Sequence, residues 1–117
     1  METESLYEKL IAWGADVKKA RERLLEDDEL YVNCLKDFAA DRNFELLRVA
    51  VSEERWRDAF EYAHAIKGVA GNLGLEPIFS LSSQIAEPLR SGRHEGIKDK
   101  TDDMQKLERE YISIVNG

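Results

Sequence analysis

Residues 60–74 read FEYAHAIKGVAGNLG and carry the strongest pattern in the chain. At about 100° per residue, apolar and small side chains recur on one arc of a helical wheel, so this segment is expected to be a helix. The expected core arc consists of Ala59, Tyr62, Ile66, Ala70 and Leu73, with Ala63 and Val69 at its margins. His64 falls opposite this arc, and we therefore expect its imidazole to face solvent.

The side of this helix that carries His64 also carries two glycines, Gly68 and Gly71. Each costs a helix interior about 0.8–1 kcal/mol relative to alanine, so helix propensity alone does not explain them. We interpret both as clearing the surface beside the imidazole for another molecule. Lys67 places a cation within reach of a negative group on the ring. The other residues of this face are Arg57 and Glu61. The pattern suits a partner-docking face that accepts a phosphoryl group.

The motif His64-x-x-Lys67-Gly68, with Gly74 ten positions after the histidine, resembles the signature of histidine-containing phosphotransfer (HPt) domains. The resemblance extends from about residue 16 to residue 115. Its flanking positions are Asp28-Glu29-Leu30-Tyr31, Leu35, Phe38, Ala50, Trp56, Ile78, Leu81, Ile85, Arg90 and Gly92. Ala86 departs from the family, many members of which carry an acidic residue there.

The resemblance implies that His64 is the phosphoacceptor and that phosphoryl groups come from, and go to, aspartates of response-regulator receiver domains. Those receivers, or a hybrid sensor histidine kinase, are the expected partners. It also implies that the Mg²⁺ of the reaction lies on the receiver, so this chain needs no cofactor or metal of its own. Lys67 would screen the phosphoryl charge. Gln84, on the following helix, is a candidate hydrogen-bond partner of the imidazole or the phosphoryl oxygens.

Length and composition indicate one domain over residues 1–117, with a peripheral N-terminal helix in residues 1–15 and a core domain in residues 16–117. With 43% hydrophobic and 35% charged residues, the chain is typical of a folded globular protein. The net charge of −7 argues against nucleic-acid binding and against long-range attraction to acidic partners. Without a long apolar run or a signal peptide, we expect a cytoplasmic monomer that binds no membrane.

Helical spacing recurs along the chain, and we find no strand pattern. We expect helices over residues 3–13, after a cap at Asp16, and after the acidic run 26–28, with a break at residues 41–43. Ser52 is expected to cap the long helix that carries His64, Gly74 to end it, and Pro77 to lie in the first turn of the next helix. Pro88 should kink or end that helix, and residues 91–96 should form a loop before a last helix to residue 115. The sequence thus predicts an all-α protein: an antiparallel four-helix bundle with one or two short additional N-terminal helices.

The same residues allow two other functions to be compared with phosphotransfer. Glu61-x-x-His64 has the spacing of a di-iron carboxylate bundle, but the second such pair is missing because Ser91 precedes His94 at that spacing. We expect His94 to be exposed and to have no functional role. No nucleotide-binding motif is present, which favours a phosphocarrier without its own ATP site over an enzyme. The alternative is a non-phosphorylated helical adaptor that binds a receiver domain or kinase and modulates signalling.

Overall fold

The structure, a computed structural model, describes residues 2–117, and Met1 of the expected 1–117 domain lies outside the described residues. Seven α-helices and no strand are present within residues 2–117. They are α1 (Glu2–Trp13), α2 (Val17–Arg23), α3 (Asp28–Ala39), α4 (Asn43–Ser52), α5 (Trp56–Asn72), α6 (Glu76–Arg90) and α7 (Ile97–Asn116). The expected all-α fold is confirmed.

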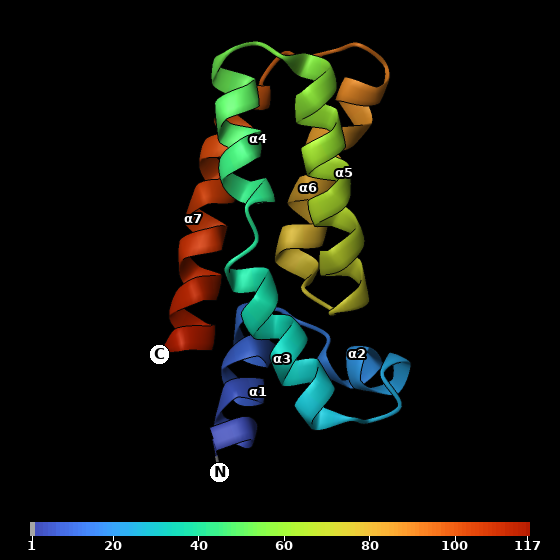
Figure 1. Cartoon of the computed structure of the whole chain (residues 1–117), viewed down its shortest axis with the longest axis vertical. Helices are drawn as coiled ribbons and strands as arrows, with labels where there is room; N and C mark the ends of the chain where they lie inside the picture. Colours follow the sequence, from blue (N-terminus) through green and yellow to red (C-terminus); the bar gives the residue numbers. More distant parts are fainter. Residues whose placement is uncertain (1) are drawn as a thin grey trace.

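Four helical arms form the bundle (Figure 1). The first arm consists of α3 and α4, which are separated by a break at residues 40–42, as the sequence predicted. The chain then returns along α5, reverses into α6 and reverses again into α7, so that successive arms are antiparallel. The two short helices α1 and α2 lie at the end of the bundle where α3 begins. This is the predicted four-helix bundle with two additional N-terminal helices.

The core is continuous along the bundle and extends under the N-terminal helices. Phe38 and Phe44 lie on either side of the α3–α4 break with ring centroids 5.1 Å apart, and Phe38 also contacts Tyr111 of α7. Leu10 of α1 is fully buried, and Trp13 packs against Tyr111 with centroids 5.8 Å apart. The burial of these side chains ties α1 to α7, since each large apolar group removed from water contributes about 1.5–3 kcal/mol.

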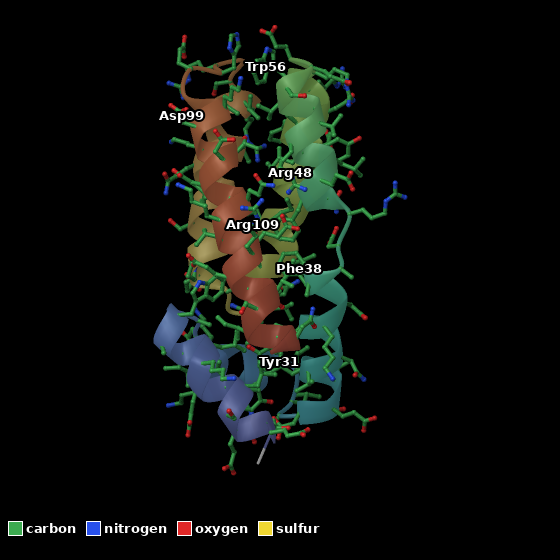
Figure 2. All side chains as sticks on the ribbon, turned by 90° about the vertical axis from the view of Figure 1, so that its left-hand side faces the viewer. Tyr31, Phe38, Arg48, Trp56, Asp99 and Arg109 are labelled. Atoms are coloured by element: carbon green, nitrogen blue, oxygen red, sulfur yellow. The ribbon has the colours of Figure 1, made fainter. Side chains whose placement is uncertain are left out.

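Polar contacts link the same helices. Figure 2 shows Arg48 between α4 and α7, where its guanidinium pairs with Glu108 at 2.7 Å. The buried hydroxyl of Tyr111 donates to the carbonyl oxygen of Leu35 at 2.6 Å, and burial raises the pKa of this phenol. Trp56 and Tyr31 mark opposite ends of the bundle in this view.

Two of the expected helix starts are confirmed by their capping bonds. The carboxylate of Asp16 accepts from the backbone N–H of Lys19 at 3.0 Å, and that of Asp27 accepts from Leu30 at 3.0 Å. Such bonds satisfy N–H groups that have no partner within the first turn of a helix. The acidic run at residues 26–28 is therefore a helix start, as expected.

The prediction that Ser52 caps the His64 helix is wrong. Ser52 is the last residue of α4, and its hydroxyl donates back to the carbonyl oxygen of Val49 at 3.0 Å. The chain turns through Glu54, whose φ of +55° is left-handed, and the N–H of Arg55 donates to the carbonyl oxygen of Ala50 at 2.8 Å. This closing bond ends α4, so α5 begins only at Trp56.

The turn that follows α5 agrees with the sequence. Gly74 has a φ of +71°, a left-handed conformation that glycine adopts without strain, and Pro77 lies in the first turn of α6. Pro88 lies inside α6, which ends two residues later at Arg90. No helix within residues 2–117 is long and apolar enough to cross a membrane.

Candidate functional site

The helix α5 presents His64 on its solvent face. Ala59, Ala63, Ile66 and Ala70 are fully buried on the opposite face. Ala63 is therefore central to the core arc, whereas Tyr62, a predicted member of the arc, is only half-buried, and Val69 is 37% exposed. The arc is rotated slightly from the one predicted, but His64 is exposed, as expected.

One side of the His64 imidazole is covered by an aromatic ring from the preceding turn. Phe60 stacks on His64 with ring centroids 5.6 Å apart and an interplanar angle of 18°. The guanidinium of Arg90, from the end of α6, lies 5.1 Å from the centroid of the Phe60 ring. This packing restricts the orientation of the imidazole while leaving it in contact with solvent.

Lys67, one turn beyond His64, is held by the neighbouring helix. Its Nζ donates to Oε1 of Glu87 at 3.2 Å, and its side chain is 26% exposed. The second carboxylate oxygen of Glu87 lies 3.6 Å from Nε of Arg90. Glu87 thus lies between Lys67 and Arg90, and a negative group on the imidazole would compete with it for Lys67.

The two helical glycines have different surroundings. A Cβ placed on Gly68 would meet no atom within 4 Å, so this position leaves the surface beside His64 open. A Cβ on Gly71 would lie 3.1 Å from the ring of Phe79 on α6. Our interpretation of Gly71 as cleared surface is therefore corrected, because its missing side chain lets α6 pack closely against α5.

A groove of about 500 Å³ runs beside His64 between three helices. From α5 it is lined by His64, Lys67, Gly68 and Gly71, and from α6 by Glu76 and Phe79. Two further cations, Lys19 and Arg23, reach it from α2. Figure 1 shows α2 beside the C-terminal end of α5. The groove therefore combines an exposed imidazole with three basic side chains in an acidic protein.

The position of α2 follows from the turn after α5. The N–H of Asp16 donates to the carbonyl oxygen of Gly74 at 2.8 Å, and a Cβ on Gly74 would overlap the carbonyl oxygen of Asp16. Arg23 donates from Nη1 to the carbonyl oxygen of Gly71 at 2.5 Å. The start of α2 is thereby fastened to the turn after α5, and its last residue, Arg23, to the last turn of α5. Glycine is required at position 74 for two reasons: its φ is left-handed, and a side chain there would overlap the carbonyl oxygen of Asp16.

The remaining candidate residues lie outside this groove. Gln84 donates to the hydroxyl of Ser80 at 3.3 Å, along its own helix, so the expected contact with the imidazole is absent. Arg57 and Glu61 are exposed and do not line the groove. His94 is exposed, as expected, and its ring stacks on Trp56 with centroids 4.5 Å apart.

The sequence reasoning missed four residues of the site: Phe60, Glu87, Lys19 and Arg23. Phe60 precedes His64 by four positions, a spacing that places two side chains side by side on a helix. The same spacing relates Lys19 and Arg23, but it does not reveal that α2 packs beside α5. In the part of the chain from Glu2 onward, no group of three His, Cys, Asp or Glu residues could hold a metal ion.

One of the comparisons with known proteins finds a family match. The family model of the Hpt domain matches residues 31–116, which contain α4 to α7 and most of α3. No curated protein and no solved structure gives a significant match. Hpt domains are phosphocarrier modules that interact with the receiver domains and kinases of two-component systems. With a model match over most of its length and a helical bundle that exposes a histidine, the chain belongs to the Hpt domain family of phosphorelay proteins.

Proposed function

We propose that His64 accepts a phosphoryl group from the aspartyl phosphate of a receiver domain and passes it to another receiver. The observation that supports this most directly is the exposed imidazole itself, oriented by Phe60 and followed by the open surface at Gly68. A receiver must bring its phosphoaspartate to within bonding distance of the imidazole, which requires such an open approach.

The chemistry is a nucleophilic displacement at phosphorus. A neutral imidazole nitrogen of His64 donates its lone pair to form the P–N bond, and the P–O bond to the aspartate breaks. The aspartate leaves as a carboxylate, and the imidazole loses the N–H proton of its other nitrogen to solvent. Transfer onward reverses these steps on a second aspartate.

The other residues have supporting roles in this proposal. Lys67 screens the phosphoryl charge, an effect worth about 1 kcal/mol or less at a wet site. Gly68 permits close docking, and Arg57 and Glu61 flank the contact on the N-terminal side. The receiver supplies the Mg²⁺ and the phosphoryl group, so the donor is a second protein and not ATP bound to this chain. The relay takes place in the cytoplasm, with the chain acting as a monomer.

Phosphoryl transfer can be tested directly with labelled receivers. A panel of purified receiver domains is phosphorylated with ³²P-acetyl phosphate and mixed with the wild type, His64→Gln and His94→Gln. We expect acid-labile, base-stable label on the wild type and on His94→Gln, and none on His64→Gln. Binding of a receiver that moves no label and is insensitive to His64→Gln would overturn the proposal and favour the adaptor.

A further inference from the structure

Two cations of the groove, Lys19 and Arg23, come from α2, which lies outside the residues matched by the Hpt family model. They are one helical turn apart at positions i and i+4, so both side chains lie on the same face of α2. The adjoining face carries the buried Val17 and Ala20. Lys19 and Arg23 line the groove that contains His64, whereas Lys18 and Glu22 of the same helix do not.

Neither of these cations is neutralised within the part of the chain that the structure describes. Arg21 pairs with Asp28 and Lys67 pairs with Glu87, but no carboxylate of residues 2–117 lies within ion-pair distance of Lys19 or Arg23. Arg23 makes one hydrogen bond, to the carbonyl oxygen of Gly71. A guanidinium has five N–H donors, so most of its donors remain available to a second molecule.

The position of Arg23 separates it from a phosphoryl group on His64. Gly71 is seven residues beyond His64, about 10 Å along the helix axis. Arg23 is fastened at Gly71, too far from the imidazole for direct contact with the phosphoryl oxygens. The cations of α2 therefore face the surface of the molecule that docks over His64, and a ligand for them must extend along the groove.

We propose that Lys19 and Arg23 form a second docking element, which binds acidic side chains of the receiver domain beside the transferred phosphoryl group. This inference rests on the proposed function. A protein that holds Mg²⁺ does so through carboxylates, and the acceptor in the proposed reaction is itself an aspartate. The transferring edge of such a protein is acidic, whereas the net charge of −7 on this chain repels it overall. Local cations beside His64 offset that repulsion.

The test compares α2 variants that remove positive charge. Lys19→Gln removes one charge from the groove, and the double variant Lys19→Gln/Arg23→Gln removes two. Lys18→Gln is matched to Lys19→Gln, because it removes one charge from an exposed position on α2 that does not line the groove. Transfer from a phosphorylated receiver is measured at low and high salt. At low salt we expect the double variant to lose roughly tenfold in kcat/KM, mainly through KM, and to lose less at high salt. Lys18→Gln should stay near the wild type.

Two further measurements separate docking from other effects. Thermal unfolding checks the fold, and Lys19→Gln keeps the bond between Arg23 and Gly71, so its expected loss of several-fold cannot come from that bond. Phosphorylation of His64 by phosphoramidate, a small donor without an acidic protein surface, should proceed at the wild-type rate in all variants.

Three results would contradict us in different ways. An effect of the double variant no larger than that of Lys18→Gln would overturn the docking element. An equal loss of the phosphoramidate reaction would also overturn it, since the cations would then act on the phosphoryl group itself. If the wild type takes label from no receiver, the proposed function fails, and this inference fails with it.

Discussion

Lys67 and Glu87 form an ion pair from α5 to α6, with 3.2 Å between Nζ and Oε1, one turn from His64. A phosphoryl group on His64 would compete with Glu87 for the lysine. The charge available to phosphohistidine therefore depends on a carboxylate that the motif does not contain.

Replacing Glu87 by glutamine should lengthen the lifetime of phosphohistidine. With the carboxylate removed, the Lys67 ammonium is free to pair with the phosphoryl oxygens, which we expect to slow hydrolysis roughly two- to fivefold. The decay of ³²P-labelled protein measures this effect. Asp103→Asn, an exposed charge change on α7, is the control and should leave the lifetime unchanged. Equal phosphohistidine lifetimes for Glu87→Gln and the wild type would show that the ion pair with Glu87 does not keep Lys67 from the phosphoryl group.

Alanine at the two helical glycines should affect stability differently. Gly68→Ala places a methyl group in open space, so the free energy of unfolding should rise by about 0.8–1 kcal/mol. Gly71→Ala brings its Cβ to 3.1 Å from the Phe79 ring, and displacement of that ring should cancel the gain. Urea unfolding of both variants measures the difference. Equal stabilisation at both sites would mean that Phe79 moves aside without cost.

A larger side chain at position 68 should reduce phosphoryl transfer from a receiver while leaving the stability of the fold unchanged. Gly68→Gln projects into the space over which a receiver approaches His64, while its side chain meets no atom of this chain near Cβ. We expect receiver-dependent transfer to fall at least roughly tenfold, because small displacements of reacting groups are costly. Phosphoramidate labelling and the melting temperature should change little. An unchanged transfer rate would argue against close docking here.

Gly74→Ala should be the most destabilising of the glycine substitutions. A left-handed φ costs a residue with a side chain about 1–2 kcal/mol, and the added Cβ would also overlap the carbonyl oxygen of Asp16. We expect a loss of more than about 2 kcal/mol. Gly92→Ala is the matched control, because Gly92 has a φ of +76° but open space around its Cβ position. If both variants lose the same stability, the contact with Asp16 contributes nothing.

Asp28→Asn should reduce stability in a way that depends on pH. Hydrogen bonds from the Tyr7 hydroxyl at 2.6 Å and from Arg21 at 2.8 Å lower the pKa of the Asp28 carboxyl below its ordinary 3.8. A lowered pKa in the folded state means that the contribution is complete above about pH 4 and is lost as pH falls further. Urea unfolding should therefore give the variant a lower free energy of unfolding than the wild type at pH 7, and the difference should shrink as pH falls below about 4.

The Tyr7 hydroxyl, which donates to Asp28, should make stability fall with rising pH in the alkaline range. Burial and the bond to Asp28 raise the pKa of Tyr7 to about 12. The wild type should therefore lose stability as pH rises from about 10 toward 12, where the unfolded phenol ionises first. For the acid range, the outcome that contradicts us is a difference in the free energy of unfolding between Asp28→Asn and the wild type that stays constant from pH 2.5 to pH 7. The hydrogen bonds of Asp28 with Tyr7 and Arg21 would then not be the source of the pH dependence.

The bundle could be predicted from the sequence because its determinants are local. Apolar spacing placed Ile66 and Ala70 in the core and His64 opposite them, and Gly74 marked the end of the helix through its backbone preference. The start of α5 could not be predicted, because a bond from Arg55 back to Ala50 ends α4 and overrides the capping preference of Ser52.

The missed parts of the site depend on contacts between helices. Spacing within α5 shows that Lys67 is near His64, but the pair with Glu87 depends on how α6 lies against α5. In the same way, the sequence does not show that Phe79 of α6 lies beside Gly71. It also does not show that Gln84 donates to Ser80 and not to the His64 imidazole. The spacing of residues along one sequence does not give the distances between side chains on different helices.

The attachment of α2 at Gly74 and Gly71 has an evolutionary consequence. The bonds that hold this helix use backbone carbonyl groups of the α5 terminus, and its groove-facing side chains take no part in the bundle core. Substitutions at Lys19 could therefore accumulate without disturbing the histidine or its scaffold. Paralogous proteins with the same bundle could thus diverge in the signalling pathway they serve through changes on one peripheral helix.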